Sequence, residues 1–426
     1  MLKVTDVKKI VVVTNARIPY ANNIADGPGY RLWSLLSPLK THFSITVLSL
    51  YESLYEGLRK ENDVEENRIN IRCIPYKPTY VAGVIRSETP DVLIFTPWSS
   101  IIFASAYQKF TPSIIDYVGP SIMENLLYAK VNLHFLLSYK LKSFWYGDFF
   151  TTTNERLRYY LLGMFTASKR ILQYSRKQGD PIIHVLPMTP PLESPTASKT
   201  ISRQNEEFTI LLAGALLPWY DYGTLLNALY LLKKRKIKFK LVIMGGNIRT
   251  IKFDGLSIIK SMMTRYELKD NIEITGLVPF KERAKYYLQS DVGLSLNLNT
   301  LENELSTRTR IIDYLWGKMP VITAGGDELS ELVVENHCGL SYKFGDPHDL
   351  FRIFSYLIDN RDILAKYKVN IEHLLSEKLN TSKVIAPLLA FLESPRVCAY
   401  RRTPFSVSTL IGVYLHYIKN KQYKHR

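Results

Sequence analysis

The stretch HVLPMTPPLESPTASKTISRQNEE, residues 184–207, separates two parts of the sequence that repeat one pattern. It is rich in proline, serine and threonine, which is typical of a linker between domains. On both sides of it, strand-like apolar runs alternate with helical stretches, and this alternation predicts a doubly wound parallel sheet. We therefore predict two α/β domains, over residues 1–195 and 208–392, followed by a basic tail over 393–426.

The predicted strands are short runs rich in β-branched residues. They are KKIVVVTN (8–15), FSITVLSL (43–50), DVLIFTPW (91–98), SIIDYVG (113–119) and the start of DFFTTTNERLRYYLLGMF (148–165) before the linker, and FTILLAGAL (208–216), FKLVIMGGN (239–247), IEITGLV (272–278), VGLSLNL (292–298) and PVITAGG (320–326) after it. Such runs are typical of strands buried on both faces of a parallel sheet. Because ligands bind beyond the carboxyl ends of such strands, we expect the domains to face each other across a cleft that holds the ligand.

The composition is that of a soluble globular protein of more than one domain. Apolar residues make up 46% and charged residues 22% of the 426 positions, which argues against disorder and against a membrane protein. No segment offers about 18 uninterrupted apolar residues, and residues 1–19 lack the apolar core of a signal peptide. The three cysteines, Cys73, Cys338 and Cys398, lie far apart and form neither a disulfide framework nor a metal box, which fits a reducing cytoplasm.

The net charge of +16 predicts an attraction to polyanions, and part of it is concentrated near the C-terminus. Residues 396–426 hold seven Lys and Arg and no acid, and residues 404–426 also place apolar side chains at helical spacing. Two interpretations stay open for this segment: a helix that packs back on the first domain, or an anchor on an anionic membrane surface. No basic-aromatic module supports a nucleic-acid partner.

The stretch ENELSTRTRIIDYLWGKMPVITAGG, residues 302–326, combines acids and arginines just ahead of a helical apolar pattern. Ser306 is a good helix N-cap, and Gly317 ends the pattern. Arg308 and Arg310 then lie in the first turn, where each cation opposes the helix dipole at a cost of about 0.3–1 kcal/mol. A bound anion would reverse the sign of that contribution, so the pattern predicts a diphosphate site built from N–H groups and guanidinium groups.

The non-functional alternative for this stretch is a surface helix in which Arg310 and Asp313 pair at spacing i, i+3. Sequence resemblance favours the functional interpretation. The segment resembles the donor-binding signature of GT-B glycosyltransferases, especially the glycogen-synthase-like family 4 of the group 1 enzymes, whose fold is two Rossmann-like domains facing across a cleft. Asp313 stands seven residues before Pro320, where that family usually has the glutamate that holds the ribose hydroxyls of the nucleotide.

The same resemblance implies an acid that contacts the donor sugar, and this acid would be Glu302 or Glu304. The pattern E-x3-S-x-R-T-R-x2-DYLW resembles a bacterial and archaeal subgroup and favours Glu302. The catalytic residues implied in this way are Glu302, Arg308 and Arg310.

Several further positions resemble the family's substrate contacts. ADGPGYR (25–31) resembles its glycine loop, in which backbone N–H groups turn toward an anion, although a tight turn would also explain the glycines. The glycine pair in VIMGGN permits close backbone approach, and GLVPFKERAKYYLQSDVGLSL (276–296) resembles the stretch near the base, although Arg283 and Tyr286 are equally explained as helix-surface residues. The candidate substrate-binding residues are Gly27, Gly29, Arg31, Asp116, Gly245, Gly246, Val278, Glu304, Ser306, Thr307 and Asp313.

The resemblance implies transfer of a sugar from a nucleotide-diphosphate donor to a glycan, lipid-linked or other acceptor, with retention at the anomeric carbon. It implies no metal or other cofactor, because arginines and helix N-termini replace the cation, and the sequence has no metalloprotease, serine-hydrolase or Walker motif. Most family members carry an Arg and a Lys where this chain has Ala215 and the run 218–221. This departure favours one alternative, a catalytically degenerate nucleotide- or glycan-binding protein. A sugar-nucleotide epimerase is a second alternative, and it would need an acid/base set that the sequence does not show.

Overall fold

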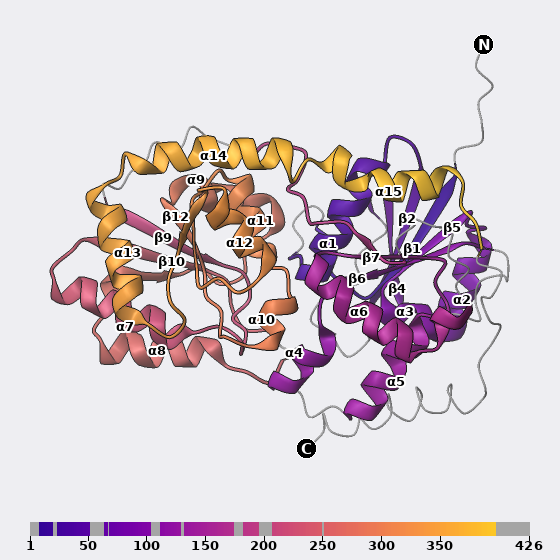
Figure 1. The fold of residues 1–426 in the computed structure, drawn as a ribbon, viewed down its shortest axis with the longest axis horizontal. Helices are drawn as coiled ribbons and strands as arrows, with labels where there is room; N and C mark the ends of the chain where they lie inside the picture. Colours follow the sequence, from indigo (N-terminus) through magenta and orange to yellow (C-terminus); the bar gives the residue numbers. More distant parts are fainter. Residues whose placement is uncertain are drawn as a thin grey trace, which may run out of the picture.

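The computed structural model describes residues 8–19, 24–51, 64–66, 68–103, 111–128, 132–173, 182–195, 207–248 and 251–397. Within these residues the chain forms two α/β domains that lie side by side (Figure 1). Each domain has its own sheet with helices packed on both faces. The predicted fold class, two doubly wound Rossmann-like domains, is confirmed.

The N-terminal domain contains an eight-stranded sheet. Its strands are β1 (Lys9–Thr14), β2 (Ser44–Tyr51), β3 (Val64–Glu66), β4 (Ile69–Pro75), β5 (Val92–Phe95), β6 (Ser113–Tyr117), β7 (Phe149–Thr152) and β8 (His184–Val185). They follow the order β3-β4-β2-β1-β5-β6-β7-β8, and every pairing is parallel except that of β3 with β4. The strand order reverses beside β1, which makes the sheet doubly wound.

Both faces of this sheet are covered by helices. They are α1 (Gly27–Leu36), η1 (Ser37–Leu39), α2 (Pro78–Ser87), α3 (Pro97–Ile102), α4 (Ser121–Tyr128), α5 (Leu133–Ser143), α6 (Glu155–Ala167) and η3 (Arg170–Gln173). The central strand shows why its sequence is continuously apolar. Ile10 and Val12 pack into the core on one face, whereas Val11 and Val13 pack into the core on the other, because successive side chains of a strand point in opposite directions.

The C-terminal domain contains a six-stranded parallel sheet. Its strands are β9 (Phe208–Ala213), β10 (Phe239–Met244), β11 (Ile272–Ile274), β12 (Val292–Ser295), β13 (Val321–Thr323) and β14 (Gly339–Ser341), in the order β11-β10-β9-β12-β13-β14. Its helices are α7 (Tyr222–Lys234), α8 (Gly255–Arg265), η4 (Lys269–Asn271), η5 (Phe280–Glu282), α9 (Ala284–Gln289), α10 (Leu301–Leu305), α11 (Thr309–Trp316), α12 (Glu328–Glu335) and α13 (Pro347–Asp359). The order reverses between β9 and β12, so these two strands flank the place where such sheets bind ligands.

All the predicted strands are present, but several end earlier than predicted. The run 292–298, for example, forms β12 only as far as Ser295. The residues after such a strand leave the hydrogen-bonded ladder and form the loops at the carboxyl edge of the sheet. These loops carry most of the candidate site.

Two long helices connect the domains again after the second sheet. Figure 1 shows α14 (Ile363–Glu377) along the C-terminal domain and α15 (Thr381–Glu393), in yellow, along the N-terminal domain. Ile385, Leu388 and Leu392 of α15 pack into the core beneath β1, although the predicted second domain included them. None of the described helices is long and apolar enough to cross a membrane. The predicted tail helix, 404–426, lies outside the described residues.

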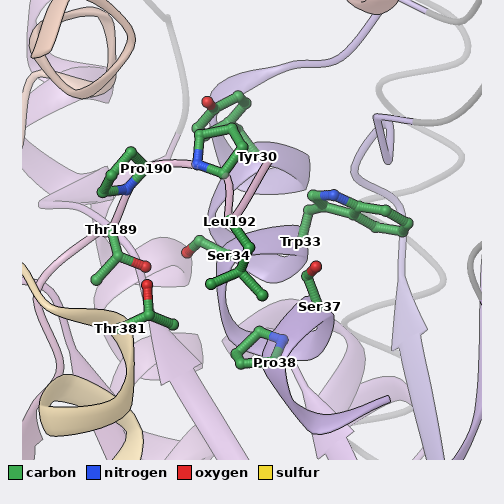
Figure 2. Close-up of a pocket in the computed structure, with 10 residues that line it drawn as sticks. Tyr30, Trp33, Ser34, Ser37, Pro38, Thr189, Pro190, Leu192 and Thr381 are labelled. Atoms are coloured by element: carbon green, nitrogen blue, oxygen red, sulfur yellow. The ribbon is translucent and has the colours of Figure 1, made fainter. Parts of the chain in front are cut away.

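A small hollow lies where the chain crosses between the domains. Figure 2 shows Tyr30 and Trp33 of α1 on one side of it, with Pro190 and Leu192 of the linker and Thr381 at the start of α15 on the other. Its walls are largely apolar side chains and proline rings. Tyr30 reaches from this hollow toward the second domain, where its hydroxyl takes part in the network described below.

Candidate functional site

Residues 302–326, the candidate anion site, form α10, α11 and the strand that follows them. The predicted helix start at Ser306 is wrong: Ser306 is the C-cap of α10, and α11 begins at Thr309. The Ser306 hydroxyl donates to Oε1 of Glu302 at 2.7 Å and so does not cap α11. Arg308 occupies the N-cap position, and no described side chain caps α11 there. The start of α11 therefore presents N–H groups to another acceptor.

Arg308 is held in a buried, two-pronged ion pair with Glu302. Its Nη1 and Nη2 donate to the two carboxylate oxygens at 3.0 and 2.8 Å, and it also donates to Oδ1 of Asn303. Burial would lower the pKa of Arg308, but the Glu302 carboxylate raises that pKa above its usual value. Asn303 in turn donates to the carbonyl of Gly325 at 2.9 Å, which ties α10 to the turn after β13. Glu304, the other candidate acid, is exposed.

Arg310 points in a different direction, toward the loop that follows β9. Its guanidinium carbon lies 4.0 Å from the ring centroid of Tyr220, and its Nη2 donates to the carbonyl of Ala215 at 3.3 Å. The side chain is 7% exposed. The non-functional alternative requires Arg310 to pair with Asp313, and this pair is not formed. Arg310 stacks on the Tyr220 ring instead, and Asp313 bonds to Arg283.

Asp313 belongs to a network that joins the domains. Its Oδ2 accepts hydrogen bonds from Tyr287 at 2.9 Å and from Nη1 of Arg283 at 3.2 Å, and its Oδ1 accepts from the Tyr30 hydroxyl. Arg283 packs its guanidinium against the ring of Phe280, 3.7 Å from the centroid. Burial would lower the pKa of Arg283, but Asp313 raises it. In this structure the carboxylate expected to hold ribose hydroxyls is therefore occupied by protein groups.

The predicted glycine loop brings the starts of two helices together. A Cβ on Gly27, at the start of α1, would lie 3.8 Å from the Thr309 side chain at the start of α11. Gly29 allows a close backbone approach instead, because a Cβ there would lie 1.8 Å from the carbonyl oxygen of Arg17 and only glycine fits. Two helix N-termini from different domains thus approach each other. That of α1 is capped by Asp26, which accepts from the Gly29 amide at 2.8 Å, whereas that of α11 is capped by no described side chain and can favour an anion.

Arg31 and Asp116 do not reach this place. Both are fully buried and pair with each other, Nη2 to Oδ1 at 3.0 Å, and Arg31 also donates to the carbonyl of Leu186 at 2.6 Å. They hold α1, β6 and the start of the linker together. In this structure both side chains are therefore taken up by contacts within the N-terminal domain, and their contact with substrate stays a prediction.

The predicted glycine pair lies at the carboxyl end of β10. A Cβ on Gly245 would lie 1.8 Å from the Gly214 carbonyl oxygen, so this glycine allows the loops after β9 and β10 to touch. The carbonyl of Gly246 accepts a hydrogen bond from the Leu216 amide at 3.0 Å. Val278 is partly buried and packs against the core that contains α11. The Gly214–Gly245 contact lies near Arg310, because a Cβ on Gly214 would lie 3.6 Å from Nη2 of Arg310.

Thr307 lies between the two arginines and contacts the N-terminal domain. Its hydroxyl donates to the Thr153 hydroxyl at 2.8 Å and accepts from Nδ2 of Asn154 at 2.9 Å. A second link between the domains is the ion pair of Arg156 with Glu331, at 2.6 Å. The domains therefore contact each other on both sides of the α10–α11 segment.

Sequence reasoning missed the network around Asp313. The helix-surface interpretation of Arg283 is wrong, because this residue is 6% exposed and bonds to Tyr30, 253 positions away. Tyr287 was not singled out. No local signal could have found these contacts, because spacing along a chain carries no information about partners in another domain.

With this geometry established, comparison with known families and structures is informative. Residues 194–373 match the family Glycosyl transferases group 1. The match covers most of the C-terminal domain and less than half of the chain. A search of curated proteins found no significant match to the sequence.

Solved structures share the arrangement of both domains. Anabaena Alr3699/HepE, solved with UDP and glucose, gives a TM-score of 0.68 at 13% identity over 91% of this chain and 100% of its own. The sucrose-phosphate synthase of Thermosynechococcus elongatus gives 0.66 at 12% identity over 91% and 98%. A glycosyltransferase of Rickettsia africae gives 0.60 at 15% identity over 91% and 98%. At these identities the likeness shows the fold, which is the GT-B fold.

Two titratable groups of the N-terminal domain, Glu124 and Lys140, interact with each other, and Glu124 also interacts with the charge of Glu302. Glu124 of α4 is half-buried, and burial together with the negative charge of Glu302 raises its pKa to about 7. Lys140 of α5 is buried, which lowers its pKa to about 8, and it donates to the Ser121 hydroxyl at 3.0 Å. Perturbed pKa values of this kind cluster at functional sites.

Across the part of the chain that the structure describes, no group of three or more His, Cys, Asp or Glu side chains could hold a metal ion. The positive charge that the structure does place at the site comes from guanidinium groups and helix N-termini.

Proposed function

We propose that this protein is a glycosyltransferase that moves a sugar from a nucleotide-diphosphate donor to a glycan or lipid-linked acceptor, with retention at the anomeric carbon. One observation carries the proposal. In a group 1 domain, Arg310 and the uncapped start of α11 lie together at the carboxyl ends of β9 and β12, where the strand order reverses.

The leaving group of this reaction is a nucleoside diphosphate, so catalysis depends on stabilising its growing negative charge. Arg310 supplies a fixed positive charge, and the N–H groups at the start of α11 supply hydrogen-bond donors. Most family members carry an Arg and a Lys beside the position of Ala215. Here the guanidinium of Arg310 reaches that carbonyl from α11, which supports Arg310 as their replacement.

The two other candidates for catalysis act as a unit in this proposal. Glu302 contacts the donor sugar, and Arg308 positions the Glu302 carboxylate through its two hydrogen bonds. The ion pair with Arg308 supports Glu302 over Glu304, because it fixes the Glu302 carboxylate beside the start of α11, whereas Glu304 is open to solvent.

The nucleotide-sugar donor is supported by the similar structures. The Anabaena protein was solved with UDP, with UDP and glucose, and with UDP-glucose. The test is calorimetric binding of a panel of nucleotide sugars, followed by release of nucleoside diphosphate when acceptors are added, with the anomeric configuration of the product read by NMR. Absence of binding by every nucleotide sugar would sink the proposal.

One observation favours the alternative of a nucleotide- or glycan-binding protein without turnover. The carboxylate of Asp313 is taken by Tyr30, Tyr287 and Arg283, so the ribose contact of active relatives is missing in this arrangement. Binding of nucleotide sugar without release of nucleoside diphosphate, over a broad acceptor panel, would select this alternative.

The proposed site of action is the cytoplasmic side of a membrane, where lipid-linked acceptors are presented. This part of the proposal rests on the basic, amphipathic sequence of residues 404–426. Co-sedimentation with anionic liposomes, with and without those residues, tests it, and equal pelleting would remove it.

A further inference from the structure

Two polar side chains at the end of β12 have no hydrogen-bond partner among the described residues. They are the hydroxyl of Ser295 and the carboxamide of Asn297, of which both the nitrogen and the oxygen are unbonded. The two residues are 0% and 1% exposed. Each buried polar group left unpaired costs about 1–3 kcal/mol, so native proteins rarely keep one without a bound molecule to satisfy it.

The alternation of side chains along β12 shows where these groups lie. Val292, Leu294 and Leu296 pack into the large core on one face of the sheet. Gly293 and Ser295 of β12 therefore share the opposite face, and Asn297 follows two positions after the strand ends. On that face a Cβ at Gly293 would lie 2.4 Å from the ring of Tyr314, so α11 covers it.

The helix and the strand run in opposite directions over this face. Tyr314 lies above Gly293, and Arg310 lies one turn nearer the start of α11. Ser295 is further along the strand toward its carboxyl end and therefore lies closer to the first turn of α11. Asn297 follows it in the loop after the strand.

The loop after β9 closes the other side of this place. β12 pairs directly with β9, Val292 opposite Ile210, and the strand order reverses between these two strands. The amide of Leu298 donates to the carbonyl of Trp219 at 3.0 Å, which fastens the chain just after Asn297 to the loop that carries Tyr220. Asn297 therefore lies beside that loop, whose Tyr220 ring stacks with Arg310 of α11.

The chemistry of the groups selects the ligand. A phosphate oxygen only accepts hydrogen bonds, so it would leave the carboxamide oxygen of Asn297 unpaired and facing a negative charge. A sugar hydroxyl both donates and accepts, and can therefore satisfy the nitrogen and the oxygen of the carboxamide together. The positive charge that a phosphate needs is already supplied nearby by Arg310.

We propose that Asn297, assisted by Ser295, binds a hydroxyl group of the donor sugar and so selects which sugar the protein accepts. This inference rests on the proposed function. A site built to bind a hydroxyl rejects an analogue that lacks it, because the buried polar groups then stay unpaired.

The test uses the full-length chain with UDP-glucose, its deoxy-sugar analogues and free UDP as probes, measured by isothermal titration calorimetry. Asn297→Leu keeps the approximate size of the side chain and removes its polar atoms. We expect it to weaken UDP-glucose binding about ten-fold or more and UDP binding less than about three-fold. The wild-type chain should bind one deoxy analogue more weakly than it binds UDP-glucose. The variant should bind that analogue and UDP-glucose with equal affinity.

Ser295→Ala should weaken UDP-glucose binding about three-fold. Its matched control is Ser355→Ala, because the hydroxyl of Ser355 on α13 is also buried and unbonded but lies outside the candidate site. The control should bind both ligands like the wild-type chain. The unliganded Asn297→Leu chain should melt no lower than the wild type, because it loses only unpaired polar atoms.

Failure of the wild-type chain to bind any nucleotide sugar would overturn the proposed function and this inference with it. Normal binding of UDP-glucose by Asn297→Leu, or equal weakening of UDP and UDP-glucose, would overturn only the inference. If Asn297→Leu does not fold, Ser295→Ala and the deoxy analogues on the wild-type chain decide the question. Equal binding of every analogue would then count against a hydroxyl subsite.

Discussion

The guanidinium of Arg283 donates a 3.1 Å hydrogen bond to the hydroxyl of Tyr30, and this bond joins the two domains. The same guanidinium pairs with Asp313 and lies against three aromatic rings. A buried cation is tolerated here because a carboxylate, a hydroxyl and ring faces replace its water.

Replacing Arg283 by methionine should therefore destabilise the protein strongly. The change leaves the Asp313 carboxylate in a largely buried site without its cation, at a cost of about 3–5 kcal/mol. Urea unfolding measures the loss. The double variant with Asp313→Asn should recover part of it, because the unpaired charge is then also removed. Additive losses in the double variant would show that the two residues do not interact.

Arg310→Ala should abolish binding of nucleoside diphosphate and nucleotide sugar, because it removes the cation at the start of α11. Arg310→Lys should retain weak binding, since it keeps the charge but loses the planar guanidinium that stacks on Tyr220. Arg352→Ala is the matched control, because Arg352 is an exposed arginine on α13. Unchanged affinity in Arg310→Ala, measured by calorimetry, would remove the central support of the proposed function.

Glu302→Gln should lower kcat by a factor of about 100 or more, whereas Glu304→Gln should change it less than about two-fold. Glu302 is buried in the ion pair with Arg308, and Glu304 is exposed. Initial rates of nucleoside diphosphate release measure both variants. Glutamine keeps the shape of the glutamate side chain. The melting temperatures of the two variants show whether any loss of activity comes from unfolding. Equal rates in the two variants would contradict the assignment.

Stability should depend on pH through Glu124. Its folded-state pKa of about 7 lies above the ordinary value of 4.5, so the folded chain holds a proton there that the unfolded chain has lost. The stability that this proton contributes is complete below pH 4.5 and is lost as the pH rises through 7. Glu124→Gln should therefore show a smaller fall in stability between pH 5 and pH 7, by on the order of 1–2 kcal/mol. Parallel urea titrations of wild type and variant at the two pH values provide the measurement.

Treatment with EDTA followed by gel filtration should leave the rate of sugar transfer unchanged. In the proposed mechanism Arg310 and the start of α11 meet the charge of the leaving group, so no cation is needed there. Loss of activity that Mg²⁺ or Mn²⁺ restores would contradict this prediction.

The architecture could be predicted from the sequence because its signals are local. The apolar run 8–15 is continuous since both faces of β1 are covered, and the restart of the pattern at 208 marks a second sheet. A strand or a helix is recognisable from the period of its own side chains. Strand ends were less accurate, because the last apolar residues of a run can leave the ladder and enter a loop.

The sequence by itself determined two doubly wound domains and a segment, 302–326, rich in groups that bind anions. Only the tertiary structure decided what each group does. Arg308 and Arg310 are two positions apart, yet Arg308 bonds to Glu302 whereas Arg310 bonds to the loop after β9. Asp313 finds its partners 30 and 283 positions away. The physical reason is that helix and strand periods reside in neighbouring residues, whereas the partner of a charge is whichever group the packing of the chain brings within a few ångströms.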